Sequence, residues 1–168
     1  MESRWSDAEA AKLREQYGAA GEDVALRLYT ARLIGAEPDL VLHGGGNVSV
    51  KSRARDRFGR EIDTLHVKGS GGELATLELA GLPALRLERA ERDEDMVAEQ
   101  RRALLDANAP NPSIETLLHA FLPAKFVDHS HADAILALAN QPDAQKRFAA
   151  LYGASVGFVP YVMPGFAL

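Results

Sequence analysis

Cysteine is absent from the 168 residues of this chain. A disulfide framework and a thiolate-bound zinc site are therefore excluded, so any metal ion must be held by His, Asp or Glu. Basic residues are not in excess either, because 19 Lys and Arg stand against 24 Asp and Glu, for a net charge of -5. The chain thus lacks the electrostatic footprint of a protein that binds nucleic acid or an anionic membrane surface.

Long apolar stretches are missing as well. No run approaches the roughly 18 apolar residues that a membrane-spanning helix needs, and residues 1–18 are too charged for a signal peptide. We therefore expect a cytoplasmic protein without a membrane partner. The length fits one domain, and a hydrophobic content of 46% is enough for that domain to bury an ordinary core.

Hydrophobic spacing, capping residues and turn residues predict alternating helices and strands. The expected helices cover residues 7–17, 22–35, 93–107, 112–123, 132–140 and 143–153. The expected strands cover residues 48–51, 64–69, 83–88, 124–131 and 155–162, with a charged hairpin loop at residues 53–63. Elements in this order predict a single α/β layered domain with mixed strand pairing.

Two glycine-rich segments lie beside predicted strands: HGGGNVS at 43–49 and VKGSGGE at 67–73. Either one alone is explained equally well by a tight turn or a hairpin connection. Together they predict an anion cradle of backbone N–H groups and nearby side chains, able to hold a phosphate or a carboxylate. The side chains that could contribute are Asn47, Ser49, Lys68 and Ser70.

An acidic residue, Glu115, is expected in the first turn of the helix that begins just after Pro112. Its commonest role there is to interact with the helix dipole. However, Glu115 and His119 are four residues apart and would share one partly buried helix face with leucines. A buried Glu beside a His is a candidate base or metal ligand, so both interpretations stay open.

Two histidines, His129 and His131, stand near the end of a predicted strand in VDHSHADA. Residues i and i+2 of a strand point to the same face about 7 Å apart, so the two imidazoles could bind one metal ion. A single His on an apolar strand is more often a core residue, but a pair preceded by Asp128 favours a metal site. Such a site still needs a third ligand.

Four motifs, taken in order, resemble the class II aldolase and adducin head-domain family: GGGNVSVK, VKGSGGEL, PSIETLLHAFLP and FVDHSHADAILALANQ. The resemblance is strongest to the aldolase half of bifunctional rhamnulose-phosphate aldolase/short-chain dehydrogenase proteins, and it extends from about Trp5 to the closing VPYVMPGFAL. It implies a three-layer α/β/α fold around a mainly antiparallel sheet. It also implies a homotetramer with active sites at subunit interfaces.

The resemblance also implies a role for each matched residue. The phosphate of a sugar phosphate would be bound by Gly46, Asn47, Ser70, Gly71 and Ser113. Glu115 would be the acid/base group, and His129 and His131 would bind Zn²⁺ or another divalent metal. The reaction would be retro-aldol cleavage of a ketose phosphate to dihydroxyacetone phosphate and an aldehyde, with the metal stabilising the enediolate and Glu115 moving its proton.

Two departures from the family pattern limit this expectation. Position 114 is Ile where sugar-phosphate aldolases often have a second Ser, and no His follows His131 to supply the third metal ligand. We therefore expect residues 1–168 to form the N-terminal portion of the domain without its final strands, and the fold to be incomplete at the C-terminus. With Glu115 as the remaining ligand, zinc binding should be weak and aldolase activity low.

Other functions stay open at this point. The same site could epimerise a sugar phosphate, and a non-catalytic adducin-like interaction module would share the fold. Retention of Glu115, His129 and His131 argues against the interaction module. The chain could also be the front piece of an aldolase fused to a nicotinamide-dependent dehydrogenase, although no GxGxxG motif after a strand occurs within it.

Overall fold

The computed structural model describes residues 2–87 and 96–163. The helices are α1 (Asp7–Tyr17), α2 (Glu22–Gly35), α4 (Met96–Ala103), α5 (Thr116–Phe121), α6 (Asp133–Ala139) and α7 (Ala144–Tyr152). The strands are β1 (Asn47–Arg55), β2 (Glu61–Val67), β3 (Ala84–Arg86) and β4 (Phe126–His129). Two short 3₁₀ helices, η1 (Gly18–Ala20) and η2 (Leu79–Gly81), connect them.

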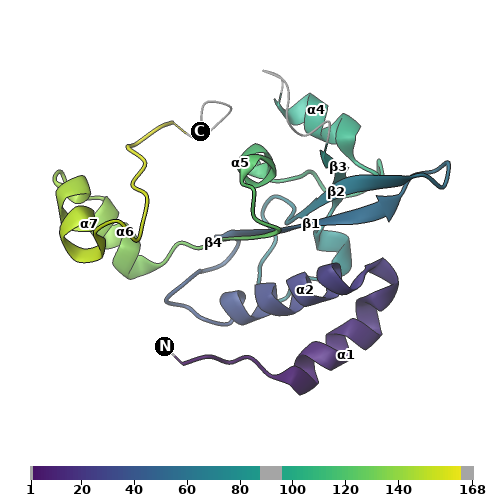
Figure 1. Cartoon of the computed structure of the whole chain (residues 1–168), viewed down its shortest axis with the longest axis horizontal. Helices are drawn as coiled ribbons and strands as arrows, with labels where there is room; N and C mark the ends of the chain where they lie inside the picture. The colour runs from purple at the N-terminus through teal and green to yellow at the C-terminus, as the bar shows by residue number, and fades with distance from the viewer. Residues whose placement is uncertain (1, 88–95, 164–168) are drawn as a thin grey trace.

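The strands form one sheet in the order β3-β2-β1-β4, and every neighbouring pair is antiparallel. Helices α1 and α2 lie on one side of this sheet, and α4 and α5 lie on the other (Figure 1). The layered α/β fold around a mainly antiparallel sheet, which the family resemblance implied, is confirmed. The mixed strand pairing expected from the order of elements is wrong, because every described pair is antiparallel. The candidate residues therefore have to be placed with respect to the two faces of the sheet.

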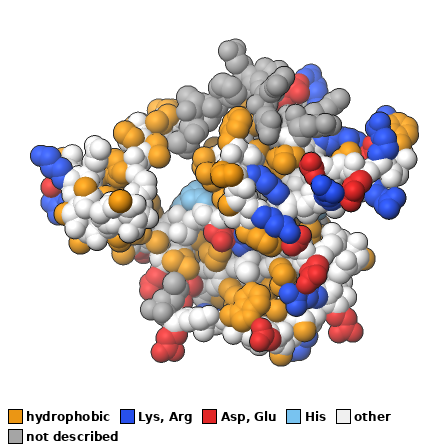
Figure 2. All heavy atoms as spheres, viewed as in Figure 1, with side chains coloured by type: hydrophobic (Ala, Val, Ile, Leu, Met, Phe, Trp, Pro, Cys, Tyr) orange, Lys and Arg blue, Asp and Glu red, His pale blue; other side chains and the backbone are white. Residues whose placement is uncertain are grey.

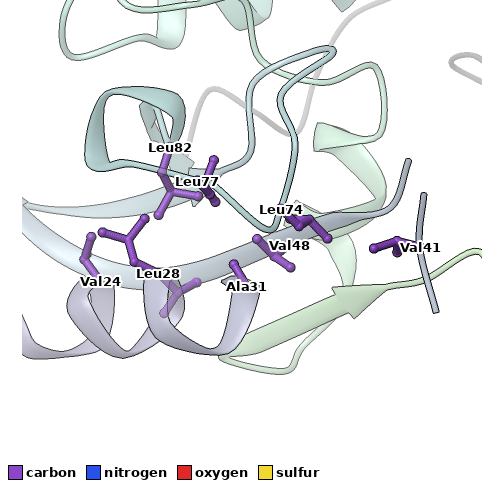
Figure 3. Close-up of a cluster of buried hydrophobic side chains, with 9 residues drawn as sticks. Val24, Leu28, Ala31, Val41, Val48, Leu74, Leu77 and Leu82 are labelled. Atoms are coloured by element: carbon purple, nitrogen blue, oxygen red, sulfur yellow. The ribbon is translucent and has the colours of Figure 1, made fainter. Parts of the chain in front are cut away.

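The main core lies between the sheet and α2. Val48 of β1 is fully buried there, in one cluster with Val24 and Leu28 of α2 (Figure 3). Val50 of β1 is fully buried in the same cluster. Leu74, Leu77 and Leu82, from the chain between β2 and β3, close this cluster. A smaller cluster on the other face joins Leu65, Val67, Leu85, Ala103 and Ala120. Because side chains alternate along a strand, β1 presents its even-numbered residues to α2 and its odd-numbered residues to α5.

The helices α1 and α2 form where capping and spacing predict them. The Ser6 hydroxyl accepts a hydrogen bond from the Glu9 backbone N–H and caps α1. Gly21 begins α2 with a φ of 109°, a backbone conformation that favours glycine. Gly35 ends α2 in a close approach, because a Cβ there would lie 2.0 Å from the Ala75 backbone nitrogen.

Two strands are longer than the sequence pattern predicts, so the expected hairpin loop at 53–63 is wrong. β1 continues to Arg55 and β2 begins at Glu61, which leaves only residues 56–60 as the loop. Cross-strand ion pairs of Arg53 with Glu61 and Asp63 explain why charged residues form strands here.

Several other elements are shorter than predicted. α4 ends at Ala103, and the part of its predicted range at 93–95 lies outside the described residues, as does residue 88 of the predicted third strand. α5 begins only at Thr116, and β4 ends at His129. The strand expected at 155–162 does not form.

The C-terminal helices α6 and α7 project from the body as a separate pair (Figure 1). They contact each other, and their only buried side chains within the described part of the chain are Ala144 and Phe148. Figure 2 shows histidine surface in the hollow between this pair and the body. Within the ranges that the structure describes, no helix combines the length and the apolar character needed to cross a membrane.

Candidate active site

One carboxylate oxygen, Oε2 of Glu115, is the centre of the candidate site. The Asn47 Nδ2 group donates to it at 2.8 Å, and the Ser113 hydroxyl donates at 3.4 Å. His129 Nδ1 lies 3.2 Å from the same oxygen. Asn47 and His129 are directly opposite each other in the β1–β4 pairing, so the sheet register brings them together. Four of the residues singled out from the sequence thus meet at one point.

Glu115 is held in its ionised form. The adjacent His129 ring lowers the pKa of Glu115 to about 2, against the opposing effect of burial and with further help from the Asn47 amide. Glu115 occupies the N-cap position of α5 rather than the first turn, so its predicted place inside the helix is wrong. Its side chain is 26% exposed, so a ligand has partial access to Glu115.

The two imidazole rings of the HxH motif lie close together. Their ring centroids are 4.8 Å apart. His131 lies beyond the end of β4, where its backbone N–H donates to the Leu40 carbonyl at 2.8 Å. The His131 ring then packs over Gly45, where a Cβ would lie 3.0 Å from its Nδ1 atom. The first glycine loop therefore makes room for a histidine.

The first glycine loop also requires a glycine at position 46. Gly46 has a φ of 69°, and a Cβ there would lie 2.6 Å from Val41 Cγ1 and 2.8 Å from the His129 carbonyl oxygen. No other residue type fits without moving the chain. The close approach of backbone to backbone at this position fixes the entry to β1 beside Asn47.

The two glycine loops lie against each other, as the anion-cradle hypothesis requires. Lys68 is buried, and its ammonium group donates to the carbonyl oxygens of Gly44 at 3.2 Å and Gly72 at 2.7 Å. Burial lowers the pKa of Lys68, and the nearby Glu115 carboxylate opposes that shift. Lys68 therefore ties the loops together rather than pointing freely at a ligand.

The second loop carries the remaining predicted phosphate-binding residues. Ser70 and Gly71 are exposed at its tip, and Gly71 has a φ of 76°. The Ser70 backbone N–H donates to the Asn111 carbonyl at 3.0 Å, just before the segment that carries Ser113. Ser70, Gly71 and Ser113 are thus held on neighbouring segments beside the Glu115 cluster.

Three buried groups near the site differ from the roles predicted for them or were not predicted at all. His119 is fully buried, its Nδ1 lies 2.8 Å from the Ser49 hydroxyl, and burial lowers its pKa to about 4. Ser49 is also fully buried, so its predicted role as a donor to an anion is wrong. Arg27 of α2 lies behind β4 as a buried cation. The only sequence signal for Arg27 is a charge within an apolar helix pattern.

The residues present fit part of a metal site. His129 Nδ1 is buried without a hydrogen bond of normal geometry, and a second imidazole lies close by, which suits a divalent ion that accepts nitrogen ligands. Within residues 2–87 and 96–163, no three His, Asp or Glu side chains form a group that could hold a metal ion. The described residues supply two imidazoles, with a carboxylate that Asn47 and Ser113 already engage.

Comparison with known proteins identifies the family of the chain. Residues 26–168 match the family model described as the class II aldolase and adducin N-terminal domain. The chain belongs to this family. The resemblance inferred from the four sequence motifs is therefore confirmed. As a class II aldolase and adducin N-terminal domain, the chain carries Glu115, His129 and His131 within the matched region.

Proteins similar to this class II aldolase-type domain include one solved structure and one longer relative. The N-terminal class II aldolase domain of a conserved protein from Thermoplasma acidophilum has a TM-score of 0.83 and 40% identity, over 99% of this chain and 76% of that chain. The uncharacterized oxidoreductase YuxG of Bacillus subtilis (strain 168) is 41% identical over an alignment of 149 residues that covers 84% of this chain and 22% of YuxG. The chain thus spans about a fifth of the length of that relative.

Proposed function

We propose that this class II aldolase-type domain cleaves a ketose phosphate by a retro-aldol reaction to dihydroxyacetone phosphate and an aldehyde. The observation that carries the proposal is the convergence of Asn47, Ser113 and His129 on one oxygen of Glu115. A partly exposed carboxylate with positioned neighbours is what a proton transfer at a substrate carbon requires. Family membership supports the same reaction class.

Glu115 is the proposed acid/base group. With a pKa of about 2 it is ionised at neutral pH, which is the form that accepts a proton. A pKa this low makes a carboxylate a weak base, because efficient general bases have a pKa nearer the working pH. Contact with His129 is the largest cause of the depression, so the geometry around His129 controls the basicity of Glu115.

His129 and His131 are the proposed metal ligands, for Zn²⁺ or another divalent ion. When bound, the ion would polarise the substrate carbonyl and stabilise the enediolate. Because no three metal-binding side chains form a group among the described residues, a complete site needs a further ligand or a movement of Glu115 toward the two imidazoles. Glu115 cannot serve fully as ligand and as base, so we expect the 168-residue chain to bind zinc weakly.

The substrate phosphate is proposed to lie at the two glycine loops, bound by Gly46, Asn47, Ser70, Gly71 and Ser113. Two observations support this placement of the phosphate. The loops are in contact, and the second loop is hydrogen-bonded to the segment before Ser113. We also propose a cytoplasmic homo-oligomer, a tetramer by family resemblance, that binds neither nucleic acid nor membranes. The net charge of -5 is consistent with that choice of partners.

Replacement of Glu115 tests the proposal. Glu115→Gln keeps the shape of the side chain and removes its ability to take up a proton, so we expect the cleavage rate to fall by about 10²- to 10⁴-fold with an unchanged far-UV spectrum. The assay measures dihydroxyacetone phosphate release from a panel of ketose phosphates with Zn²⁺ in excess. Glu61→Gln, at an exposed strand end, is the control and should keep the full rate.

Two results would contradict the proposal. One is an equal rate for wild type and Glu115→Gln, which would remove the carboxylate from the chemistry. The other is the absence of dihydroxyacetone phosphate from every substrate tested while zinc is bound. Change of configuration in a sugar phosphate without cleavage would instead favour the epimerase.

A further inference from the structure

Arg27 of α2 is a buried cation that contacts β4 on the face of the sheet opposite the candidate site. Its side chain is 1% exposed, and its guanidinium pairs with Asp128 at 2.5 Å. It also donates to the carbonyl oxygens of Ser49 at 3.4 Å and Val127 at 3.3 Å, and it lies 5.6 Å from the centre of the Phe126 ring. Arginine is rarely buried unless its charge is paired. The charge of Arg27 is paired with Asp128, and the two preceding strand residues contribute a carbonyl oxygen and an aromatic ring.

These contacts hold Asp128, and His129 is the next residue in sequence. In the β1–β4 register, Asp128 is opposite Val48 and His129 is opposite Asn47. Adjacent strand residues point to opposite faces, so Asp128 points to α2 and His129 points to Glu115. Arg27 therefore holds the strand from one side, while the His129 ring meets its partner on the other side.

β4 needs such a restraint more than the other paired strands of the site do. It pairs with β1 over four residues, whereas β1 and β2 pair over seven. β4 also stands at the end of the strand order in the part of the chain that the structure describes. A short strand at a sheet edge has little backbone bonding to fix its position, so side-chain contacts decide where it lies.

We propose that Arg27 is a positioning residue that sets the place of His129 beside Glu115. The inference rests on the proposed function only for the role of His129 as a metal ligand. Arginine suits the task because its planar guanidinium donates in several directions at once. Nη1 reaches the carbonyls of β1 and β4, while Nη2 reaches Asp128 and the Thr30 hydroxyl. A lysine would keep the charge and lose that span.

The deciding experiment compares Arg27→Lys with a matched control on the same helix. Arg32 contacts the Leu77 carbonyl at 2.9 Å, the Glu78 carboxylate at 2.7 Å and the Tyr17 ring at 5.8 Å. These partners are of the same kinds as those of Arg27, and none of them lies in β4. Both Lys variants should lower the melting temperature, and Arg27→Lys alone should disturb the geometry around His129.

The geometry is read from the ring signals of ¹³C-labelled histidines by NMR in the metal-free chain, with His129→Gln to assign the His129 signal. We expect the His129 signal to shift or broaden in Arg27→Lys and to stay in place in Arg32→Lys. Co²⁺ titration gives a second readout, in which Arg27→Lys should weaken binding at least about tenfold relative to Arg32→Lys. An unchanged His129 signal in Arg27→Lys, or equal changes in both variants, would overturn the inference.

A third variant covers the case that Arg27→Lys does not fold. The Asp128 side chain is 52% exposed, so Asp128→Asn should fold while it removes half of the ion pair. Amide hydrogen exchange at residues 126–129 should then become at least about tenfold faster, and exchange in β2 should not change. Unchanged exchange in β4 would overturn the inference. All these ring and exchange readouts stand even if the chain proves to have no aldolase activity, which would refute only the proposed function.

Discussion

The two faces of β1 are equally closed to solvent and chemically opposite. Toward α2, Val48 and Val50 are fully buried among hydrocarbon side chains. Toward α5, Asn47 and Ser49 are as deeply buried, and each is bonded to an ionisable side chain, Glu115 or His119. Burial alone therefore does not separate core from site. The apolar side chains Val48 and Val50 should add stability that does not depend on pH, whereas the ionisable partners of Asn47 and Ser49 should make stability depend on pH.

The largest effect should come from a cavity on the apolar face. Leu28 is fully buried in the main core, so Leu28→Ala should lower the free energy of unfolding by about 4 kcal/mol. The measurement is urea denaturation at pH 7 and pH 8, and the loss should be equal at both. Leu151→Ala is the control, because Leu151 is 66% exposed and its truncation should cost no more than about 0.5 kcal/mol. Equal losses for the two leucines would refute the assigned core.

A smaller effect is expected at Gly46, the residue directly before β1. Gly46→Ala should destabilise the chain by about 3 kcal/mol, through a left-handed backbone and through contact with Val41 and the His129 carbonyl. Gly59→Ala at the hairpin has a similar φ of 77° and open space around the added Cβ, so about 1 kcal/mol is expected. Thermal unfolding measures both. A cost at Gly59 as large as at Gly46 would mean that backbone strain alone explains the first loop.

The smallest effect is the pH dependence of the polar face. Burial lowers the pKa of His119 to about 4, so the unfolded chain takes up a proton first as the pH falls. The stability contribution is complete above pH 6.5 and is lost as the pH falls toward 4, amounting to about 2 kcal/mol between pH 7 and pH 5. His119→Gln should flatten this slope in denaturation curves. The low pKa of Glu115 adds a further loss below pH 4.5.

Much of this arrangement could be predicted from local sequence. Ser6 and Gly21 mark the starts of the first two helices, and both signals depend only on neighbouring residues. Asn47, Glu115 and His129 were predicted as site residues from family motifs, and the structure brings them together. Their meeting joins segments 68 residues apart, which no local pattern encodes. Arg27 was missed for this reason, since its partner Val127 is 100 residues away.

Strand ends were predicted less well, because a strand is defined by its partner. Residues 155–162 alternate in a way that is typical of a strand, yet none of the described strands pairs with them, and Val159 and Tyr161 are largely exposed. His131 was expected in β4, but its backbone N–H bonds to Leu40 instead of to a strand. Periodicity shows which residues could form a sheet, and pairing decides which ones do.

Asp128 and His129 point to opposite faces of β4, and this arrangement also disfavours a shifted strand register. A slip of one residue along β1 would turn every β4 side chain to the opposite face. Asp128 would then come next to the Glu115 carboxylate, and His129 would come next to the Arg27 guanidinium. Both encounters pair an ionised group with an unfavourable neighbour, so the wrong alignment is penalised twice. The residues proposed to act on a substrate thereby also specify the alignment that assembles them.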